Sequence, residues 1–301
     1  MPKAFCLQSS FHIDNSIIAN ADETSHVSDD MLIVVPTCAA YGDILGPFVH
    51  FFNKFWQDCP YRKIFINSPH EYHGFENFRT RKDLGWIANL LEFTRSENVG
   101  ENILLLLDDY LLCKPVSTPE IADVDRSLQG KIGYIRLIPY SDNDFNSGQG
   151  WMWPSKVPYN EKYNFVDIDR DSPQKLTRLP ISLQPAIWSV EFIKTHFDPE
   201  WSPWQQEVLG SREFCWHGSI RGISCDYLFL TTRTCAYLYV NGIRDGKFSP
   251  EFVQLLEQTP ELQPFPLTRD VAIPVDKLEK ARYRELIARQ TDGTYPKTRY
   301  G

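Results

Sequence analysis

The sequence lacks the motifs of several large enzyme classes. It contains no G-x-x-x-x-G-K-[ST] phosphate loop, no G-x-G-x-x-G after the first expected strand and no G-x-S-x-G nucleophile turn. These absences argue against P-loop nucleotide hydrolysis, dinucleotide binding of the Rossmann type and serine hydrolysis. No Cys-x-x-Cys pair and no His-Glu-x-x-His occurs either, so the usual zinc-ligand spacings are missing.

Positive charge and long apolar runs are also scarce. The 31 Lys and Arg residues are outnumbered by 39 Asp and Glu residues, which argues against broad binding to nucleic acid or to anionic lipid. The longest purely aliphatic run, at 103–107, is far too short to cross a bilayer. The first residues lack the apolar core of a signal peptide. We therefore expect a cytoplasmic protein with at most peripheral membrane contact, whose seven cysteines are reduced thiols.

Short apolar runs alternate with amphipathic segments in the first half of the chain. Strands are predicted at 31–35, 63–67 and 103–107, and helices at 44–56 and 83–95, the latter with Leu84, Ile87, Leu90 and Leu91 facing inward. This alternation predicts an α/β fold with a mostly parallel central sheet flanked by helices. We expect an N-terminal arm at 1–30, one catalytic domain at 31–265 and a helical tail at 266–301 that packs on the domain.

The second half continues with further predicted elements. Strands are expected at 131–138 and 180–188, separated by a long loop at 140–158, and a helix is expected to open at Ser189. Ser202, Pro203 and Gln205 form the signature of a capping box. Ser249 and Pro250 repeat the cap signature for a helix that reaches Gln258, and a last helix is predicted at 276–289.

The three predicted strands of the first half all end in polar or turn-forming residues. Pro36 and Thr37 follow the first strand, Asn67 ends the second, and Asp108 and Asp109 end the third. Parallel strands carry their ligand at their carboxyl ends, which makes this edge a candidate nucleotide site. Two adjacent carboxylates repel each other, and a divalent cation such as Mg²⁺ or Mn²⁺ would offset that repulsion. The alternative is that both are ordinary strand-end residues.

Three blocks in the same order carry a resemblance to a known family. They are the leucine-rich Asp108-Asp109-Tyr110 segment at 102–115, the segment at 182–188 followed by 202–211, and the segment at 240–248. Together they resemble bacterial GT-A-type glycosyltransferases of surface polysaccharide or glycan biosynthesis. The resemblance covers roughly residues 31 to 258. It implies a GT-A-like single domain that binds a nucleotide-sugar donor, UDP-linked or otherwise.

Tyr110 stands where the usual Asp-x-Asp motif has its last carboxylate. With this departure, Asp109 could hold the Mn²⁺ or Mg²⁺ ion alone with water and phosphate, or Asp108 could serve the nucleotide ribose. A metal-independent variant would instead balance the diphosphate with a basic side chain. Arg136, Arg221 and Lys247 are the nearest candidates by motif neighbourhood, and Arg136 is assigned to the nucleotide side.

An inverting transferase needs a general base to remove the proton of the acceptor hydroxyl. In the resembling enzymes this base is an Asp or Glu near the start of a helix below the acceptor cleft, and Glu207 matches that position. Trp204 lies three residues earlier, on the same helix face, where it can stack on a sugar ring. The alternative for Glu207 is a solvated carboxylate of the first helical turn.

Further acceptor contacts are expected from aromatic and amide side chains. Gln184 can bond sugar hydroxyls, and Trp188 can pack against a ring, although a core position is the more common role of such a Trp. Trp153 lies in the long loop and is assigned to the acceptor side, with a clasp that pins the loop as the alternative. Pro36, Thr37 and Asn67 are assigned to the nucleotide through their strand-end positions, Thr37 by its side chain or by the backbone around it.

The sequence thus predicts a transferase that moves a sugar from a nucleotide diphosphate to a glycan or lipid-linked acceptor, inverting through Glu207. Two other interpretations remain open. One is a catalytically inactive module that binds a sugar nucleotide or glycan. The other is a glycoside hydrolase that uses Asp109 and Glu207 as a carboxylate pair.

Overall fold

The computed structural model describes residues 31–81, 84–96, 99–139, 158–166, 181–211, 227–244 and 246–272. The predicted arm at 1–30, most of the loop at 140–158, Arg221 and the predicted helix at 276–289 lie outside these residues. The domain boundaries expected at residues 30 and 265 stay predictions.

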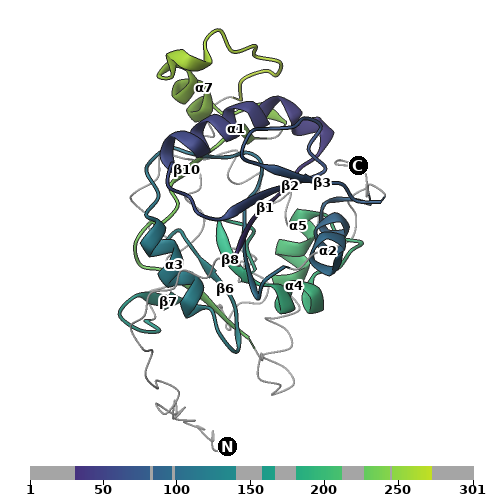
Figure 1. Cartoon of the computed structure of the whole chain (residues 1–301), viewed down its shortest axis with the longest axis vertical. Coiled ribbons are helices and arrows are strands. Elements are labelled where there is room, and N and C mark those ends of the chain that lie inside the picture. The colour runs from purple at the N-terminus through teal and green to yellow at the C-terminus, as the bar shows by residue number, and fades with distance from the viewer. Residues whose placement is uncertain are drawn as a thin grey trace, which may run out of the picture.

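A central eight-stranded sheet organises the molecule (Figure 1). Its strands follow the spatial order β3 (Glu76–Phe78), β2 (Arg62–Ile66), β1 (Leu32–Pro36), β4 (Asn102–Leu105), β8 (Ala186–Ser189), β6 (Ile132–Arg136), β9 (Leu228–Thr232) and β7 (Tyr163–Phe165). The first four strands are mutually parallel, β8 is antiparallel to both β4 and β6, β9 is parallel to β6, and β7 is antiparallel to β9. This confirms the predicted α/β class with a mostly parallel central sheet.

Helices cover both faces of this sheet. They are α1 (Gly42–Phe55), α2 (Trp86–Ser96), α3 (Thr118–Ser127), α4 (Val190–His196), α5 (Pro203–Gln205) and α7 (Pro250–Glu257). Side chains of β1 alternate between two cores, because successive residues of a strand point to opposite faces. Ile33 and Val35 pack in a core with α1 and α3, whereas Leu32 and Val34 pack in a core with α2 and α4. In Figure 1, α7 lies against the outer side of α1, away from the sheet.

Two small β-structures lie beside the main sheet and carry segments of the candidate site. Strand β5 (Tyr110–Leu112) pairs antiparallel with β10 (Tyr239–Asn241). Strands β11 (Ile243–Arg244) and β12 (Lys247–Phe248) form a second antiparallel pair directly after β10. The residues that follow β4 are therefore held by a segment that lies more than a hundred positions later in the chain.

The cap signatures of the sequence are confirmed. Ser202 and Gln205 form the capping box at the start of α5, and Ser249 accepts the backbone N–H of Phe252 at 3.0 Å. Ser189 likewise accepts the N–H of Phe192 at the start of α4. These local signals need only neighbouring residues, so the sequence places them correctly.

Two predicted element starts are wrong. Leu84 is 60% exposed instead of inward, because α2 begins only at Trp86, after Gly85 with its positive φ of 103°. The strand predicted from residue 180 begins only at Ala186. Pro185 has no N–H for the sheet, and the N–H of Leu183 is used by Glu207, so neither residue can extend β8.

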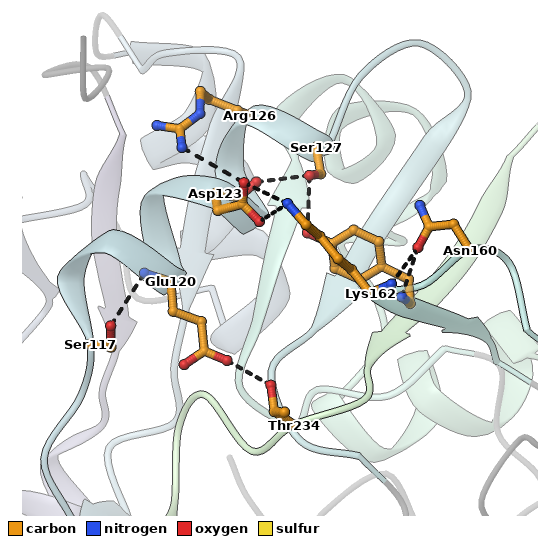
Figure 2. Close-up of polar contacts among 9 residues, drawn as sticks. Ser117, Glu120, Asp123, Arg126, Ser127, Asn160, Lys162 and Thr234 are labelled. Atoms are coloured by element: carbon orange, nitrogen blue, oxygen red, sulfur yellow. Dashed lines mark hydrogen bonds and ion pairs between the residues drawn. The ribbon is translucent and has the colours of Figure 1, made fainter. Parts of the chain in front are cut away.

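Helix α3 is joined to the neighbouring β7 segment by polar contacts, most of which are exposed (Figure 2). The ammonium of Lys162 donates to both oxygens of Asp123 at 2.8 and 3.0 Å, and the phenol of Tyr163 donates to Ser127 at 2.9 Å. On the next loop, Thr234 donates to Glu120 at 2.7 Å.

Among the helices that the structure describes, none combines the length and apolar character that crossing a bilayer requires.

Candidate functional site

The register of the sheet brings several predicted site residues to one edge. Strands β1, β2 and β4 are parallel, so Thr37, Asn67 and the Asp108–Asp109 pair all follow them at the same end. Strand β8 runs the other way, and its first residue, Ala186, pairs with Leu105 and Arg136. The segment at 181–185, just before β8, therefore reaches this carboxyl-end edge as well.

Asp108 and Asp109 occupy a turn between β4 and β5, and their carboxylates are bound by different segments. Asp108 is only 5% exposed. Its carboxylate accepts the backbone N–H of Cys38, which follows β1. The carboxylate of Asp109 accepts the N–H of Ile243 in β11, and its backbone carbonyl accepts the N–H of Gly242 at 2.7 Å. The pair is thus held by two separate segments, which we call the two walls of the candidate donor site: the chain between β1 and α1, and the chain from β10 to β11.

Burial changes the protonation of this pair. It raises the pKa of Asp109 to about 7, against the hydrogen bonds from its own backbone and Ile243 and the charge of Arg269. It also raises the pKa of Asp108 well above its ordinary value, with the charge of Asp109 acting in the same direction. Buried carboxyls that share a site hold their protons more tightly. A cation beside them would reverse that effect.

Tyr110 starts β5 and is a packing residue. It is buried, and its ring lies 4.2 Å from that of Tyr239 between centroids. The amide of Gln184 bridges the two phenols: its nitrogen donates to Tyr110 at 3.5 Å and its oxygen accepts from Tyr239. The predicted acceptor residue Gln184 therefore uses its amide to order these tyrosines.

Glu207 lies on a π-helical turn, Gln206–Gly210, that follows α5. Such widened turns recur at functional sites. Its Oε1 atom accepts the backbone N–H of Leu183 at 2.6 Å and the hydroxyl of Ser182 at 3.2 Å. Burial raises the pKa of Glu207 to about 7 in spite of these bonds and of the charge of Arg136.

Tyr110 connects the two ends of the candidate site. The charges of both Asp109 and Glu207 act on its phenol, together with that of Tyr239. The structure thus brings together three of the predicted residues around Tyr110 and Tyr239, namely Asp109, Gln184 and Glu207, with Asp108 next to Asp109 in the chain. A sequence separation of almost one hundred residues between Asp109 and Glu207 is closed by the pairing of β4 with β8.

Arg136 lies on the Glu207 side of this group. It is wholly buried and hydrogen-bonds with Tyr134, and burial lowers its pKa to about 10. The charge of Glu207 acts on it, whereas Arg269 is the cation that acts on Asp108 and Asp109. This position favours an electrostatic role beside Glu207 over the predicted contact with a nucleotide, because a wholly buried guanidinium offers no ligand surface.

The strand-end residues of β1 and β2 use their side chains within the protein. Pro36 is the last, buried residue of β1. The buried hydroxyl of Thr37 donates to the carbonyl of Ile66 at 3.1 Å. The amide of Asn67 exchanges hydrogen bonds of 2.7 and 3.0 Å with Thr80. The backbone N–H groups of Thr37 and Asn67 likewise donate within the protein, to Ile66 and Phe78, so the nucleotide contacts at these positions stay predictions.

The three tryptophans assigned to the acceptor have different outcomes. Trp188 is wholly buried and stacks on Tyr134 with centroids 4.4 Å apart, which corrects its assignment: it packs between the sheet and α4 and has no surface for an acceptor. Trp204 is 41% exposed, one helical turn before Glu207, and its acceptor role stays a prediction. Trp153 lies outside the described residues.

Sequence reasoning missed several groups that complete the site. Ser182 and Leu183 were part of a motif block, but nothing in the sequence paired them with Glu207. Tyr239 and Arg269 carried no signal, because their roles depend on chain segments that meet only in the folded protein.

Few side chains at the candidate site could bind a metal ion. No group of three His, Cys, Asp or Glu side chains that could hold an ion is found in the part of the chain that the structure describes. Mg²⁺ and Mn²⁺ sites in phosphate-handling proteins commonly use one or two carboxylates and complete their shell with phosphate and water. The partly exposed Asp109 fits that kind of site.

No family model and no curated protein matches the sequence. Among solved structures, S. aureus TarS 1-349 is similar at 12% identity and a TM-score of 0.43, over 87% of this chain and 72% of that one. TarS 1-349 in complex with UDP gives the same identity and TM-score over 87% and 70%. A longer TarS structure is 11% identical with a TM-score of 0.41, and this chain covers 43% of it.

Proposed function

We propose that the chain is a nucleotide-sugar-dependent glycosyltransferase that transfers a sugar to a glycan or lipid-linked acceptor with inversion. The observation that carries the proposal is the placement of the Asp108–Asp109 pair and of Glu207 on either side of Tyr110, at the carboxyl ends of a mostly parallel sheet. One side offers carboxylates for the donor diphosphate, and the other offers a base for the acceptor.

Glu207 suits the role of general base by its hydrogen bonds and its protonation. Among the described residues, the hydrogen bonds to its carboxylate, from Leu183 and Ser182, both fall on Oε1, so Oε2 would accept the proton of the acceptor hydroxyl. A base is most effective when its pKa lies near the working pH, and burial raises that of Glu207 to about 7. Trp204, exposed one turn earlier, would stack on the acceptor ring.

Asp109 would hold a divalent cation together with the donor diphosphate. When bound, such an ion stabilises the departing diphosphate as a Lewis acid. Asp108 is more deeply buried and is proposed for the ribose side, next to the backbone of Cys38. The neutralising charge would also remove the repulsion between the two carboxylates.

The proposal is tested by thermal unfolding of the full chain with UDP, GDP, CDP, ADP and TDP, each with and without Mn²⁺. We expect one nucleotide to raise the melting temperature and Mn²⁺ to enlarge the shift. A ligand that binds only the folded state adds about 2.7 kcal/mol to the free energy of unfolding at one hundred times its Kd. If no nucleotide changes the melting temperature and the protein alone cleaves aryl glycosides, the chain is a carboxylate-pair hydrolase and not a transferase.

Asp109→Asn sharpens this test. The variant removes the charged ligand with little change of shape, so we expect the affinity for the nucleotide with Mn²⁺ to fall by roughly tenfold to a hundredfold. Asp123→Asn on the exposed face of α3 is the matched control and is expected to bind like the wild type. Equal binding by both variants would remove Asp109 from the donor site.

A further inference from the structure

The residues just beyond the predicted catalytic domain, 267–272, lie along β12, and we call them the C-terminal strap. The N–H of Phe248 donates to the carbonyl of Asp270 at 2.9 Å, and the N–H of Ala272 donates to the carbonyl of Phe248 at 2.8 Å. Val271 forms a parallel bridge with Phe248. The strap is therefore an added edge of the β11–β12 pair.

One side chain of the strap, Arg269, reaches across to the segment between β1 and α1. Its Nε and Nη2 atoms donate to the two oxygens of Asp43, each at 2.7 Å, and Nη2 also donates to the carbonyl of Ala40. Its Nη1 atom donates to the carbonyl of Gly246 at 3.3 Å, in the turn of the hairpin. The guanidinium also lies 5.2 Å from the ring centre of Tyr41.

These contacts join the two walls of the candidate donor site. The β1–α1 segment supplies the N–H of Cys38 that binds Asp108. The β10–β11 segment supplies the N–H groups of Gly242 and Ile243 that bind Asp109. Arg269 is bonded to both segments at once, through Ala40 and Asp43 on one side and Gly246 on the other.

We propose that Arg269 is a positioning residue of the donor site, which holds the backbone N–H groups of Cys38 and Ile243 at the distance that the Asp108–Asp109 pair requires. The role in donor binding rests on the function proposed above. Arginine suits it because its planar fork binds both oxygens of Asp43 and still has donors for two carbonyls. A lysine offers a single ammonium and would keep only part of these contacts.

The test compares Arg269→Gln and Arg269→Lys with a matched control, Arg62→Gln. Arg62 makes the same two-pronged contact with Glu76, at 2.9 and 2.8 Å, but joins β2 to β3 away from the site. Two quantities are measured on the full chain: hydrogen–deuterium exchange of peptides that contain Cys38, Ile243 or α2, and affinity for the five nucleoside diphosphates with Mn²⁺.

For Arg269→Gln we expect exchange at Cys38 and Ile243 to be faster by about tenfold or more, with α2 unchanged, and nucleotide affinity to fall by about tenfold. Arg269→Lys should lie between this variant and the wild type in both quantities. Arg62→Gln should match the wild type at Cys38 and Ile243 and in affinity.

Three results would overturn the proposal. The first is that Arg269→Gln has the exchange rates and the nucleotide affinity of the wild type. The second is that exchange in α2 of this variant rises as much as exchange at Cys38 and Ile243, which would indicate a general loss of stability. The third is that Arg62→Gln loses as much nucleotide affinity as Arg269→Gln. If the wild type binds no nucleotide, the donor function fails separately, and local exchange alone decides whether Arg269 positions the pair. Should Arg269→Gln not fold, Asp43→Ala removes the bonds between the Arg269 guanidinium and the Asp43 carboxylate from the other side and carries the same readouts.

Discussion

Acidic side chains on the outer face of helix α3 and at the candidate site are arranged in opposite ways. Asp125, on the inner face of α3, is buried and is bound by Asn102 instead. On α3, Asp123 is paired with Lys162 and lies 3.7 Å from Arg126, and Glu120 accepts a hydrogen bond from Thr234 (Figure 2). These carboxylates lie at the surface, where water screens them. Charges of both signs meet there, and the arrangement fastens neighbouring segments.

At the candidate site, Asp108, Asp109 and Glu207 are bound by backbone N–H groups and one hydroxyl. Burial raises the pKa of all three. An arrangement that raises the pKa of carboxyls lowers stability at neutral pH, and stability alone does not explain it. Raised pKa values that cluster in this way are typical of functional sites, and the proposed function places its donor and its acceptor at these carboxyls.

Glu207→Gln is expected to give the largest effect. Glutamine keeps the shape and the acceptor oxygen for Leu183 and Ser182, but it cannot remove a proton. Under the proposed mechanism, kcat for sugar transfer should fall by about 10²- to 10⁴-fold, with nucleotide binding retained. Transfer rate and nucleotide affinity are measured on the same preparation.

The matched control for this variant is Glu120→Gln, which makes the same chemical change on α3. It should transfer sugar at the wild-type rate, because the carboxylate of Glu120 accepts a hydrogen bond from Thr234 beside α3 and its backbone N–H donates to Ser117 in either variant. If both glutamine variants keep full activity, Glu207 is not the base. If Glu207→Gln instead loses nucleotide binding, the residue belongs to the donor side.

The next effect is on stability as a function of pH. The folded state raises the pKa of Glu207 from 4.5 to about 7 and that of Asp109 from 3.8 to about 7. Between these values the folded chain binds more protons than the unfolded chain, so the free energy of unfolding falls as the pH rises from about 4 to 7. Each carboxyl should contribute roughly 1–3 kcal/mol to that fall.

Urea unfolding at pH 5 and pH 8 measures this loss. Glu207→Gln and Asp109→Asn should each lose less stability over the interval than the wild type, and the double variant should lose the least. An unchanged pH dependence in the double variant would show that the two carboxyls do not hold protons in the folded state.

Much of the fold could be predicted because its signals are local. The apolar runs of β1, β2 and β4 and the caps at Ser202 and Ser249 depend on neighbouring residues, and all of them appear in the structure. Leu84 shows the limit of periodicity, since its spacing fits a helix that Gly85 prevents from starting there.

The candidate site was only partly predictable, because its chemistry depends on contacts across the chain. Asp109 and Glu207 could be selected as acidic residues at element ends, yet their raised pKa values depend on burial that no local pattern gives. The sequence does not distinguish Trp188 from an exposed Trp that stacks on a sugar, but the position of Trp188 in the central strand β8 buries it. Arg269 lies in the predicted tail, and only the folded strap brings it to Asp43.

The smallest effect is expected from Lys162→Met, which breaks the exposed pair with Asp123 and keeps most of the side-chain volume. The hydrogen bond and charge of Asp123 raise the pKa of Lys162, so the stabilisation is complete below pH 10.5 and is lost as the pH rises through the raised value. Because Lys162 is 52% exposed, the variant should lose less than about 1 kcal/mol of unfolding free energy at pH 7 in low salt. The loss should nearly vanish in 1 M NaCl, where charges are screened within about 3 Å. Urea unfolding at both salt concentrations measures it. A salt-independent loss of several kcal/mol, or any loss of nucleotide binding, would show that the α3 cluster is not a screened surface contact, and the contrast with the buried carboxyls would no longer hold.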